Sequence, residues 1–136
     1  MFFMNRNPAL GLLILRLSVG GLMLFHGIAK LQHGVSGMAG MFESKGIPSF
    51  VAYGAYIGEV IAPILLILGF RTRIGALLLA FTMLVAVATA HAADIAQVSD
   101  TGGWAIELQA LYFFGALALF CTGGGAYAVS RNSRWD

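Results

Sequence analysis

Four long apolar stretches, joined by short polar segments, constrain this 136-residue chain more than any other feature. They cover approximately residues 8–30, 49–70, 74–93 and 104–122. A helix needs about 20 mostly apolar residues to cross the roughly 30 Å hydrocarbon core of a bilayer, and each stretch is close to that length. Because 59% of the residues are hydrophobic and only 10% are charged, little sequence remains for a water-soluble domain. The sequence predicts an all-α membrane protein, with residues 1–136 forming a single four-transmembrane-helix bundle.

The joints predict how these helices are arranged. All of them are short, including the glycine-rich segment 32–48 and the polar loop 94–103, so consecutive helices are expected to pack antiparallel. Arginines mark one set of span ends, at Arg6, Arg71, Arg73, Arg131 and Arg134. The other set has Lys30 and Lys45. Since Lys and Arg near span ends favour the cytoplasmic side, both termini are predicted to be cytoplasmic.

Several function classes are disfavoured by the sequence. A net charge of +2, with the basic residues at span ends instead of in one patch, argues against nucleic acid. The single cysteine, Cys121, cannot form a disulfide within the chain and is interpreted as a small buried apolar residue. No metal-ligand set or phosphate-binding loop is apparent. Haem held between His26 and His91 is also disfavoured, because so small a bundle would have to open around a macrocycle.

Small residues predict where the helices approach most closely. Gly54, Gly58 and Ala62 form one stripe at helical spacing, and Gly20 and Gly27 form another. Pro63 is expected to kink the second span and to free a backbone carbonyl near Glu59. The third span, residues 74–93, has the cleanest apolar run and is predicted to be the most lipid-exposed.

Three charged residues lie within the predicted spans: Arg16, Glu59 and Glu107. Charges in hydrocarbon are unfavourable by about 2.5–3.5 kcal/mol on insertion scales and normally face the bundle interior or water. Counting about 1.5 Å of rise per residue from the span ends gives Arg16 and Glu59 similar depths. We therefore predict an Arg16–Glu59 ion pair, either as a structural clamp that fixes helix register or as part of a proton path.

A second polar group is predicted near the outer face. His26 and Lys30 end the first span, His91 ends the third, and Glu107 follows Trp104 at the start of the fourth. Such a set could bind a polar head group, relay protons, or donate hydrogen bonds to a quinone carbonyl. The alternatives are structural: Lys30 snorkels to the interface, Trp104 anchors there, and each histidine makes a local hydrogen bond.

An ordered set of motifs resembles the DoxX family of small bacterial membrane proteins over nearly the whole chain. The matching positions are Arg16-Leu17, Gly20, His26-Gly27, Lys30-Leu31, Glu59, Leu68-Gly69-Phe70, Arg73 and Glu107. The family ends in a tail of the type Gly-Pro-Gly-Arg-Tyr-Ser-Leu-Asp. The corresponding residues 123–130 keep glycines and the tyrosine but lack the arginine and the aspartate.

The resemblance implies a multi-pass protein of the bacterial cytoplasmic (inner) membrane. Relatives include a subunit of a thiosulfate:quinone oxidoreductase and members linked with thiol systems, oxidative stress or maturation of redox enzymes. The leading hypothesis is a quinone-interacting membrane component of a redox system, with Glu107, His26 and His91 as the proton or quinone site and Lys30 and Trp104 as ligand contacts. Whether the chain is itself an oxidoreductase subunit stays open. The alternatives are a transporter or exporter of a small hydrophobic compound, which would require a homo-oligomer, and a non-enzymatic scaffold for a soluble redox partner.

Overall fold

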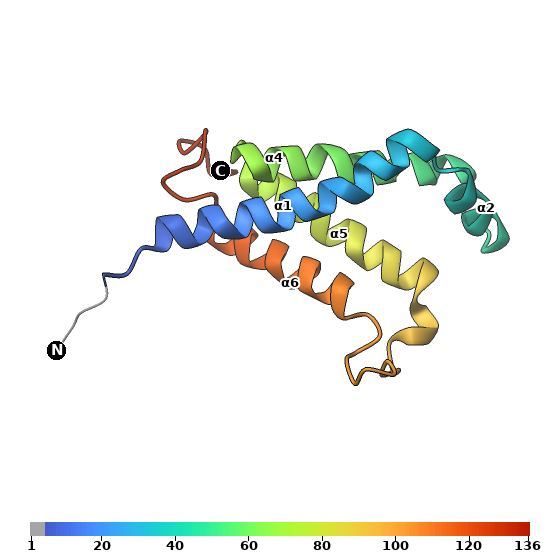
Figure 1. The fold of residues 1–136 in the computed structure, drawn as a ribbon. Coiled ribbons are helices and arrows are strands. Elements are labelled where there is room, and N and C mark those ends of the chain that lie inside the picture. Colours follow the sequence, from blue (N-terminus) through green and yellow to red (C-terminus); the bar gives the residue numbers. More distant parts are fainter. Residues whose placement is uncertain (1–4) are drawn as a thin grey trace.

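The computed structural model describes residues 5–136, which form an all-helical bundle with one isolated backbone bridge between Val98 and Trp104 (Figure 1). The helical elements are α1 (Pro8–His33), α2 (Ser36–Ser44), the 3-10 helix η1 (Ser49–Tyr53), α3 (Gly54–Tyr56), the π-helix η2 (Ile57–Ile61), α4 (Ala62–Leu68), α5 (Thr72–Ala90), the 3-10 helix η3 (Ala92–Asp94) and α6 (Glu107–Thr122). Three stretches are long and apolar enough to cross a membrane: α1, the continuous rod Ser49–Leu68, and α5. The fourth predicted span corresponds to α6, which is apolar but has only 16 residues and begins three residues later than expected.

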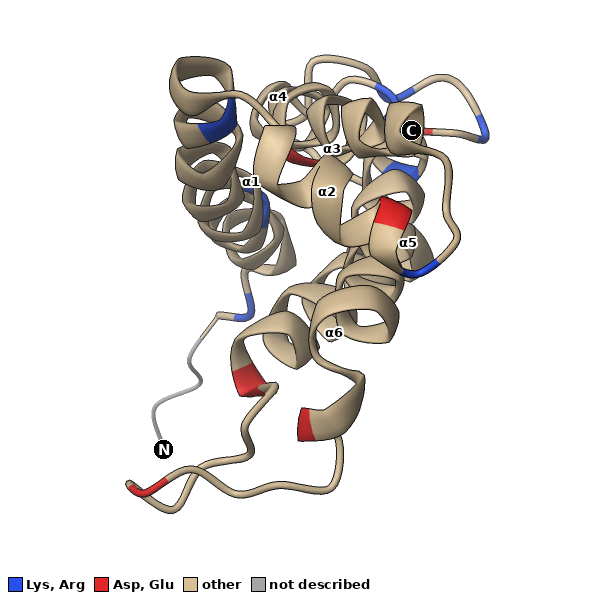
Figure 2. Ribbon diagram, turned by 90° about the vertical axis from the view of Figure 1, so that its right-hand side faces the viewer, with Lys and Arg blue, Asp and Glu red and all other residues tan. Residues whose placement is uncertain are grey.

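The two ends of the bundle differ in charge. The start of α1, the turn between α4 and α5, and the tail after α6 lie together at one end, which we call the arginine end (Figure 1). Figure 2 shows basic residues gathered beside the C-terminus, whereas the loop between α5 and α6 carries acidic ones. The opposite end, the lysine end, holds Lys30, α2 and that acidic loop. The predicted charge asymmetry is therefore present in the fold.

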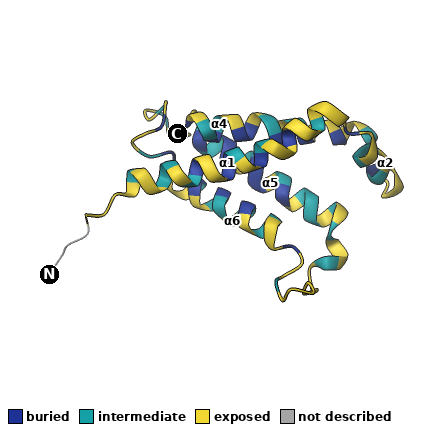
Figure 3. Cartoon of the chain, in the orientation of Figure 1, coloured by how far each residue is buried: buried dark blue, intermediate teal, exposed yellow. Residues whose placement is uncertain are grey.

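The outer surface of the bundle is apolar. Buried residues face inward, and exposed ones cover the outside of every long helix (Figure 3). Phe25, Phe81, Leu111 and Phe114 are each more than 60% exposed. A soluble protein rarely presents so many large apolar side chains to water. This surface is compatible with a membrane helical bundle.

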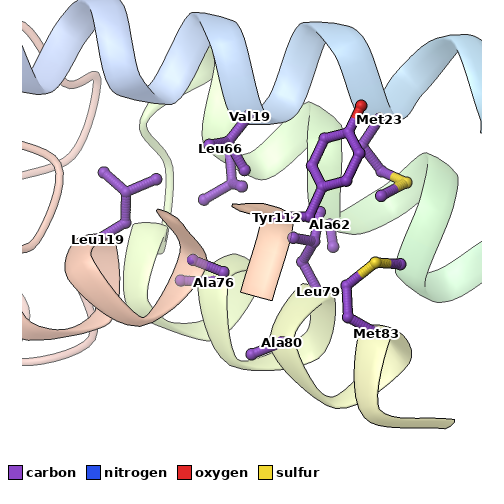
Figure 4. Packing of buried hydrophobic residues seen from close by; sticks show 11 residues of the cluster. Val19, Met23, Ala62, Leu66, Ala76, Leu79, Ala80, Met83, Tyr112 and Leu119 are labelled. Carbon is purple, nitrogen blue, oxygen red and sulfur yellow. The ribbon is translucent and has the colours of Figure 1, made fainter. Parts of the chain in front are cut away.

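The core lies between α1, α4, α5 and α6, where buried apolar side chains from all four helices meet (Figure 4). Leu66, Leu79 and Leu119 are completely buried there. α5 packs against both α4 and α6 through a stripe of six buried residues, Thr72, Gly75, Ala76, Leu79, Ala80 and Met83. The prediction that the third span is the most lipid-exposed helix is therefore wrong. Its small residues, Gly75, Ala76 and Ala80, allow neighbours to approach it from two sides.

Three of the predicted small-residue contacts are confirmed. A Cβ on Gly20 would lie 2.9 Å from the Pro63 carbonyl oxygen, and a Cβ on Gly27 would overlap the backbone carbonyl of Glu59. A Cβ on Gly58 would overlap the Thr82 side chain of α5. Close approach of α1 to the Ser49–Leu68 rod thus depends on residues without side chains.

The rod itself changes winding around Pro63. Its middle section, η2, is π-helical, and the Ala62 N–H donates to the Ile57 carbonyl five residues earlier. Proline has no N–H with which to continue the α-helical pattern, so the turn before it widens. Glu59 lies inside this π-helical turn and is buried. The kink predicted from Pro63 therefore appears as a local π-bulge that carries the buried carboxylate.

The tail after α6 folds back over the arginine end. The N–H groups of Val129 and Ser130 donate to the carbonyls of Leu68 and Gly69, at 3.1 and 3.2 Å. The Arg73 N–H, at the start of α5, donates to the Trp135 carbonyl at 3.0 Å. The tail therefore supplies hydrogen-bond partners to the end of α4 and the beginning of α5.

Asp136 fastens this tail. Its carboxylate, 4% exposed, accepts hydrogen bonds from Ser130 Oγ (2.7 Å), the Ser133 N–H (2.7 Å) and Arg71 Nη1 (3.1 Å). Burial opposes ionisation of this group, but the two serine hydrogen bonds and the Arg71 charge outweigh it and hold the Asp136 pKa below its usual range. Ionised Asp136 therefore stabilises the docked tail at pH values above the pKa that this carboxyl group has in the unfolded chain. This contribution is lost as pH falls through the lower, folded-state pKa.

We expect the tail to stay docked at about pH 4, where an ordinary aspartate is half protonated, and to detach only at lower pH. Acrylamide quenching of Trp135 fluorescence in a Trp104→Phe background measures docking. Asp136→Asn should raise quenching at neutral pH and abolish its change with acid, whereas Asp100→Asn, in the exposed loop, should alter neither. A tail that detaches well above pH 4 in the unmodified chain would contradict this account.

Candidate functional site

A cavity of about 400 Å³ lies in the half of the bundle nearest the lysine end. Its walls come from α1, α2, the η1–η2 part of the rod, α5 and α6. Methionines and phenylalanines make much of the lining, and the polar side chains that line it are His26, Lys30, Glu59, Thr82, His91, Gln109 and Tyr112. Apolar walls with a few convergent polar groups are typical of small-molecule sites, and this volume falls within their usual range of about 300–1,000 Å³. We call this space the Glu59 cavity.

An ion pair lies in its wall. Lys30 Nζ is 2.8 Å from Glu59 Oε1 and 2.7 Å from Oε2. The Lys30 side chain is 23% exposed and that of Glu59 is 9% exposed. Tyr56, on the same rod as Glu59, donates its hydroxyl to the Lys30 carbonyl at 3.2 Å and ties the end of α1 to the rod. The pair joins two helices and keeps a proton donor and an acceptor at the cavity.

The predicted Arg16–Glu59 ion pair is therefore wrong. Gly27 is the α1 residue that packs against Glu59. Arg16 lies eleven residues before Gly27, which is about 16 Å along a helix. The two predicted depths are counted from Pro8 and from Ser49, as if these residues lay at opposite surfaces of the membrane. In the structure α1 starts well beyond the end of α4, so the two counts do not begin at matching levels. Lys30, one turn past Gly27, is the cation that reaches Glu59.

Arg16 instead binds backbone carbonyls at the arginine end. Its guanidinium donates to the carbonyls of Leu66 (3.1 Å), Ile67 (3.3 Å) and Tyr127 (3.1 Å). The residue is completely buried. Two of these carbonyls belong to the last turn of α4; that of Leu66 also accepts from the Gly69 N–H at 3.2 Å, whereas that of Ile67 has no backbone donor among residues 5–136. Arg16 thus caps α4 and holds the tail.

The two histidines both reach the Glu59 cavity. His26 packs edge-on against the Tyr112 ring, with centroids 6.3 Å apart. His91 Nδ1 is 3.1 Å from Asp94 Oδ2, and His91 Nε2 is 3.4 Å from Gln109 Nε2. An Nδ1–H donor to Asp94 with Nε2 accepting from Gln109 satisfies both contacts. His91 thus links the end of α5 to α6 and is oriented by a carboxylate.

Glu107 and Trp104 are not brought to this cavity. Glu107 is the first residue of α6 and is exposed, with its carboxylate against Gly103, where the helix dipole favours a negative charge. Trp104 donates its indole N–H to the Ile95 carbonyl at 2.6 Å within the loop. Cys121 is exposed on α6, so its interpretation as a buried residue is wrong. The predicted outer cluster therefore separates into a cavity group and a loop group.

Sequence reasoning missed several polar residues of the site. Gln109 and Tyr112 line the cavity, and Asp94 orients His91. Asp94 follows His91 by three residues, a spacing that could have indicated their contact. Tyr112 lies in an apolar run and Gln109 has no charge, so neither showed a pattern that distinguished it from ordinary helix residues.

A DoxX family model matches residues 11–92, from α1 to η3. The chain belongs to the DoxX family. A relative from Bacillus subtilis (strain 168), named "Putative oxidoreductase CatD", is 38% identical over 86 residues, which are 63% of each chain. The chain therefore matches less than two thirds of that relative's length, and no solved structure matches it. His26, Lys30, Glu59 and His91 lie in the family-matched region, whereas Gln109 and Tyr112 lie outside it.

Proposed function

We propose that the Glu59 cavity binds the head group of a quinone, and that the chain is a membrane component of a redox or oxidative-stress system. In this proposal it is a four-span protein of the bacterial inner membrane with both termini in the cytoplasm. The observation that carries the proposal is the cavity itself: an apolar chamber whose walls hold Lys30, Glu59, His26 and His91. The oxidoreductase name of the Bacillus relative supports the same class of chemistry.

The polar groups suit a quinone. A quinone carbonyl accepts hydrogen bonds, which the Lys30 ammonium and the His26 imidazole can donate. Reduction to the hydroquinone consumes two electrons and two protons. Lys30–Glu59 and His91–Asp94 offer two titratable pairs for those protons. The electrons come from a soluble redox partner, for which gentle purification and identification of bound proteins is the direct test.

Access from the lipid is consistent with this assignment. Several residues that line the cavity are exposed on the outside of the bundle, including His26 of α1, Phe81 of α5 and Leu108 of α6. A quinone dissolved in the bilayer would reach the cavity from this side without crossing water. The isoprenoid chain would remain among lipid tails, where it is most soluble.

The proposal is tested by titrating the purified full-length chain with a short-tailed benzoquinone analogue in detergent. Glu59→Gln should weaken binding about tenfold, because it removes the charge that holds the Lys30 ammonium. Ala86→Phe, which fills the cavity, should abolish binding. Glu107→Gln should bind as the unmodified chain does. Absence of binding by the unmodified chain, or full binding by a folded Ala86→Phe variant, would reject the quinone site. Loss of binding in Glu107→Gln alone would place the site at the start of α6 instead.

Transport of a small hydrophobic compound is the second candidate, favoured by the same cavity beside a buried carboxylate. Against it, the space between the cavity and the arginine end is filled by Leu66, Leu79 and Leu119, each completely buried. In Figure 4 these core residues continue from Met23, Tyr112 and Met83, which border the cavity. Uptake into proteoliposomes that depends on pH and is lost in Glu59→Gln would favour transport over a closed quinone site.

A further inference from the structure

A second cavity, of about 330 Å³, lies at the arginine end, away from the Glu59 cavity. It is formed where the tail meets the start of α5 and the end of α6. Arg73, Arg131 and Arg134 line it, and the backbone of residues 123–126 forms another part of its wall. We call it the arginine-end pocket.

The positive charge in this pocket is not balanced. Its acidic lining group, Asp136, already accepts hydrogen bonds from Arg71 and from two serines. Within residues 5–136, Arg73, Arg131 and Arg134 form no ion pair. Arg73 Nε is buried and has no hydrogen-bond partner there. A pocket with three unpaired guanidinium groups and an unsatisfied buried donor favours an anion.

Neutral donors add to this preference. The N–H groups of Gly125 and Ala126 have no acceptor among the described residues, and both residues line the pocket. Gly125 has φ of +81°, the left-handed conformation that allows successive N–H groups to face one concavity. Guanidinium groups together with free backbone N–H groups are the donors that proteins use for phosphate oxygens.

The surroundings of the pocket indicate a lipid source for that phosphate. Phe70, Tyr127 and Trp135 are exposed at this end, and the Arg71 and Arg134 guanidinium groups stack on the Phe70 and Trp135 rings at 5.2 Å. Exposed aromatic rings mixed with arginines are typical of the head-group region of a membrane. Basic pockets at this level recognise anionic head groups.

We propose that the arginine-end pocket binds the phosphate of an anionic phospholipid. Arg73 supplies the buried donor, Arg131 and Arg134 supply charge at the rim, and the aromatic rings lie against the glycerol and the upper acyl chain. The bound lipid holds the tail against α5 and gives this end of the bundle a preference for an anionic leaflet. The site is independent of whether the Glu59 cavity binds a quinone.

The test uses the full-length chain in mild detergent with added phosphatidylglycerol, phosphatidylcholine or inorganic phosphate. Native mass spectrometry measures retained lipid, and thermal unfolding measures stabilisation. We expect retention of phosphatidylglycerol in preference to phosphatidylcholine and a higher unfolding temperature with phosphatidylglycerol alone. Arg73→Gln or Arg131→Gln should each reduce retention about tenfold, as loss of a charge-assisted phosphate contact implies.

Arg6→Gln is the matched control, because it removes one positive charge at the same end without lining the pocket. Retention by Arg6→Gln should stay within about twofold of the unmodified chain, since a distant exposed charge is screened. Equal retention of the two lipids, or equal losses in Arg6→Gln and Arg131→Gln, would overturn the proposal. Stabilisation by inorganic phosphate equal to that by phosphatidylglycerol would show that free phosphate, not a lipid, is the ligand.

Discussion

Gly27→Ala is expected to destabilise the bundle by about 1–3 kcal/mol, or more where the backbone cannot shift. The added Cβ would overlap the Glu59 carbonyl, which is backbone and cannot rotate away as a side chain would. α1 must then move off the π-helical turn that carries Glu59. Because Lys30 lies one turn further along α1, the same movement breaks the Lys30–Glu59 ion pair and distorts the Glu59 cavity. Stability and quinone-analogue binding should therefore fall together.

Gly21→Ala is the matched control on the same helix. Nothing lies within 4 Å of the position its Cβ would occupy. Alanine at an open helix position should leave stability unchanged or raise it by up to about 1 kcal/mol. Equilibrium unfolding in mixed detergent and sodium dodecyl sulfate micelles measures both variants. Equal effects from the two substitutions would mean that α1 and the rod are not in close contact at Gly27.

Much of the fold could be predicted from apolar length and small residues. The helix starting at Pro8 is confirmed, and its Asn7 side chain caps it by accepting from the Leu10 N–H. Gly20, Gly27 and Gly58 mark real close contacts. These features depend on local sequence and on the period of a helix, so they need no knowledge of how far one helix is shifted along another.

The sequence does not determine how far one helix is shifted along its neighbour. This shift decides which residues contact the two carboxylates, Glu59 and Glu107. Counting residues from the span ends predicts that Glu59 pairs with Arg16. In the structure Gly27 packs against Glu59, and Lys30, one turn past Gly27, forms the ion pair with it. The sequence predicts Glu107 inside a span because the fourth apolar stretch starts before it. The helix itself begins at Glu107, which leaves this residue at the surface. The better candidate for a ligand or proton site is therefore Glu59.

The tail makes contacts that sequence comparison alone does not reveal. The position of the family's last aspartate is occupied by Ser130. In the structure the Ser130 hydroxyl donates to the carboxylate of Asp136, six residues later, which also pairs with Arg71. The carboxylate next to this position therefore comes from Asp136. The tail is attached to the bundle without the arginine and the aspartate of the family motif.

Arg16→Met is expected to destabilise the arginine end by about 3 kcal/mol, since it removes a donor from three carbonyls and leaves those of Ile67 and Tyr127 unsatisfied, at a cost of about 1–3 kcal/mol each. Methionine retains the apolar stem, so the loss reports on the hydrogen bonds. Amide hydrogen exchange should rise at Val129 and Ser130, whose N–H groups donate to the same end of α4.

Arg16→Lys separates charge from geometry. A lysine ammonium keeps the positive charge, but it is a compact group on a flexible stem and cannot span carbonyls from α4 and the tail as a planar guanidinium does. We therefore expect Arg16→Lys to lose nearly as much stability as Arg16→Met, and Arg6→Met, on the exposed start of the chain, to lose little. If Arg16→Lys were as stable as the unmodified chain, positive charge alone would account for Arg16. The Glu59 cavity has its own ion pair and its own close contact at Gly27, so amide exchange around Glu59 should not rise in Arg16→Met. An equal rise there would show that Arg16 stabilises the whole bundle and not the arginine end alone.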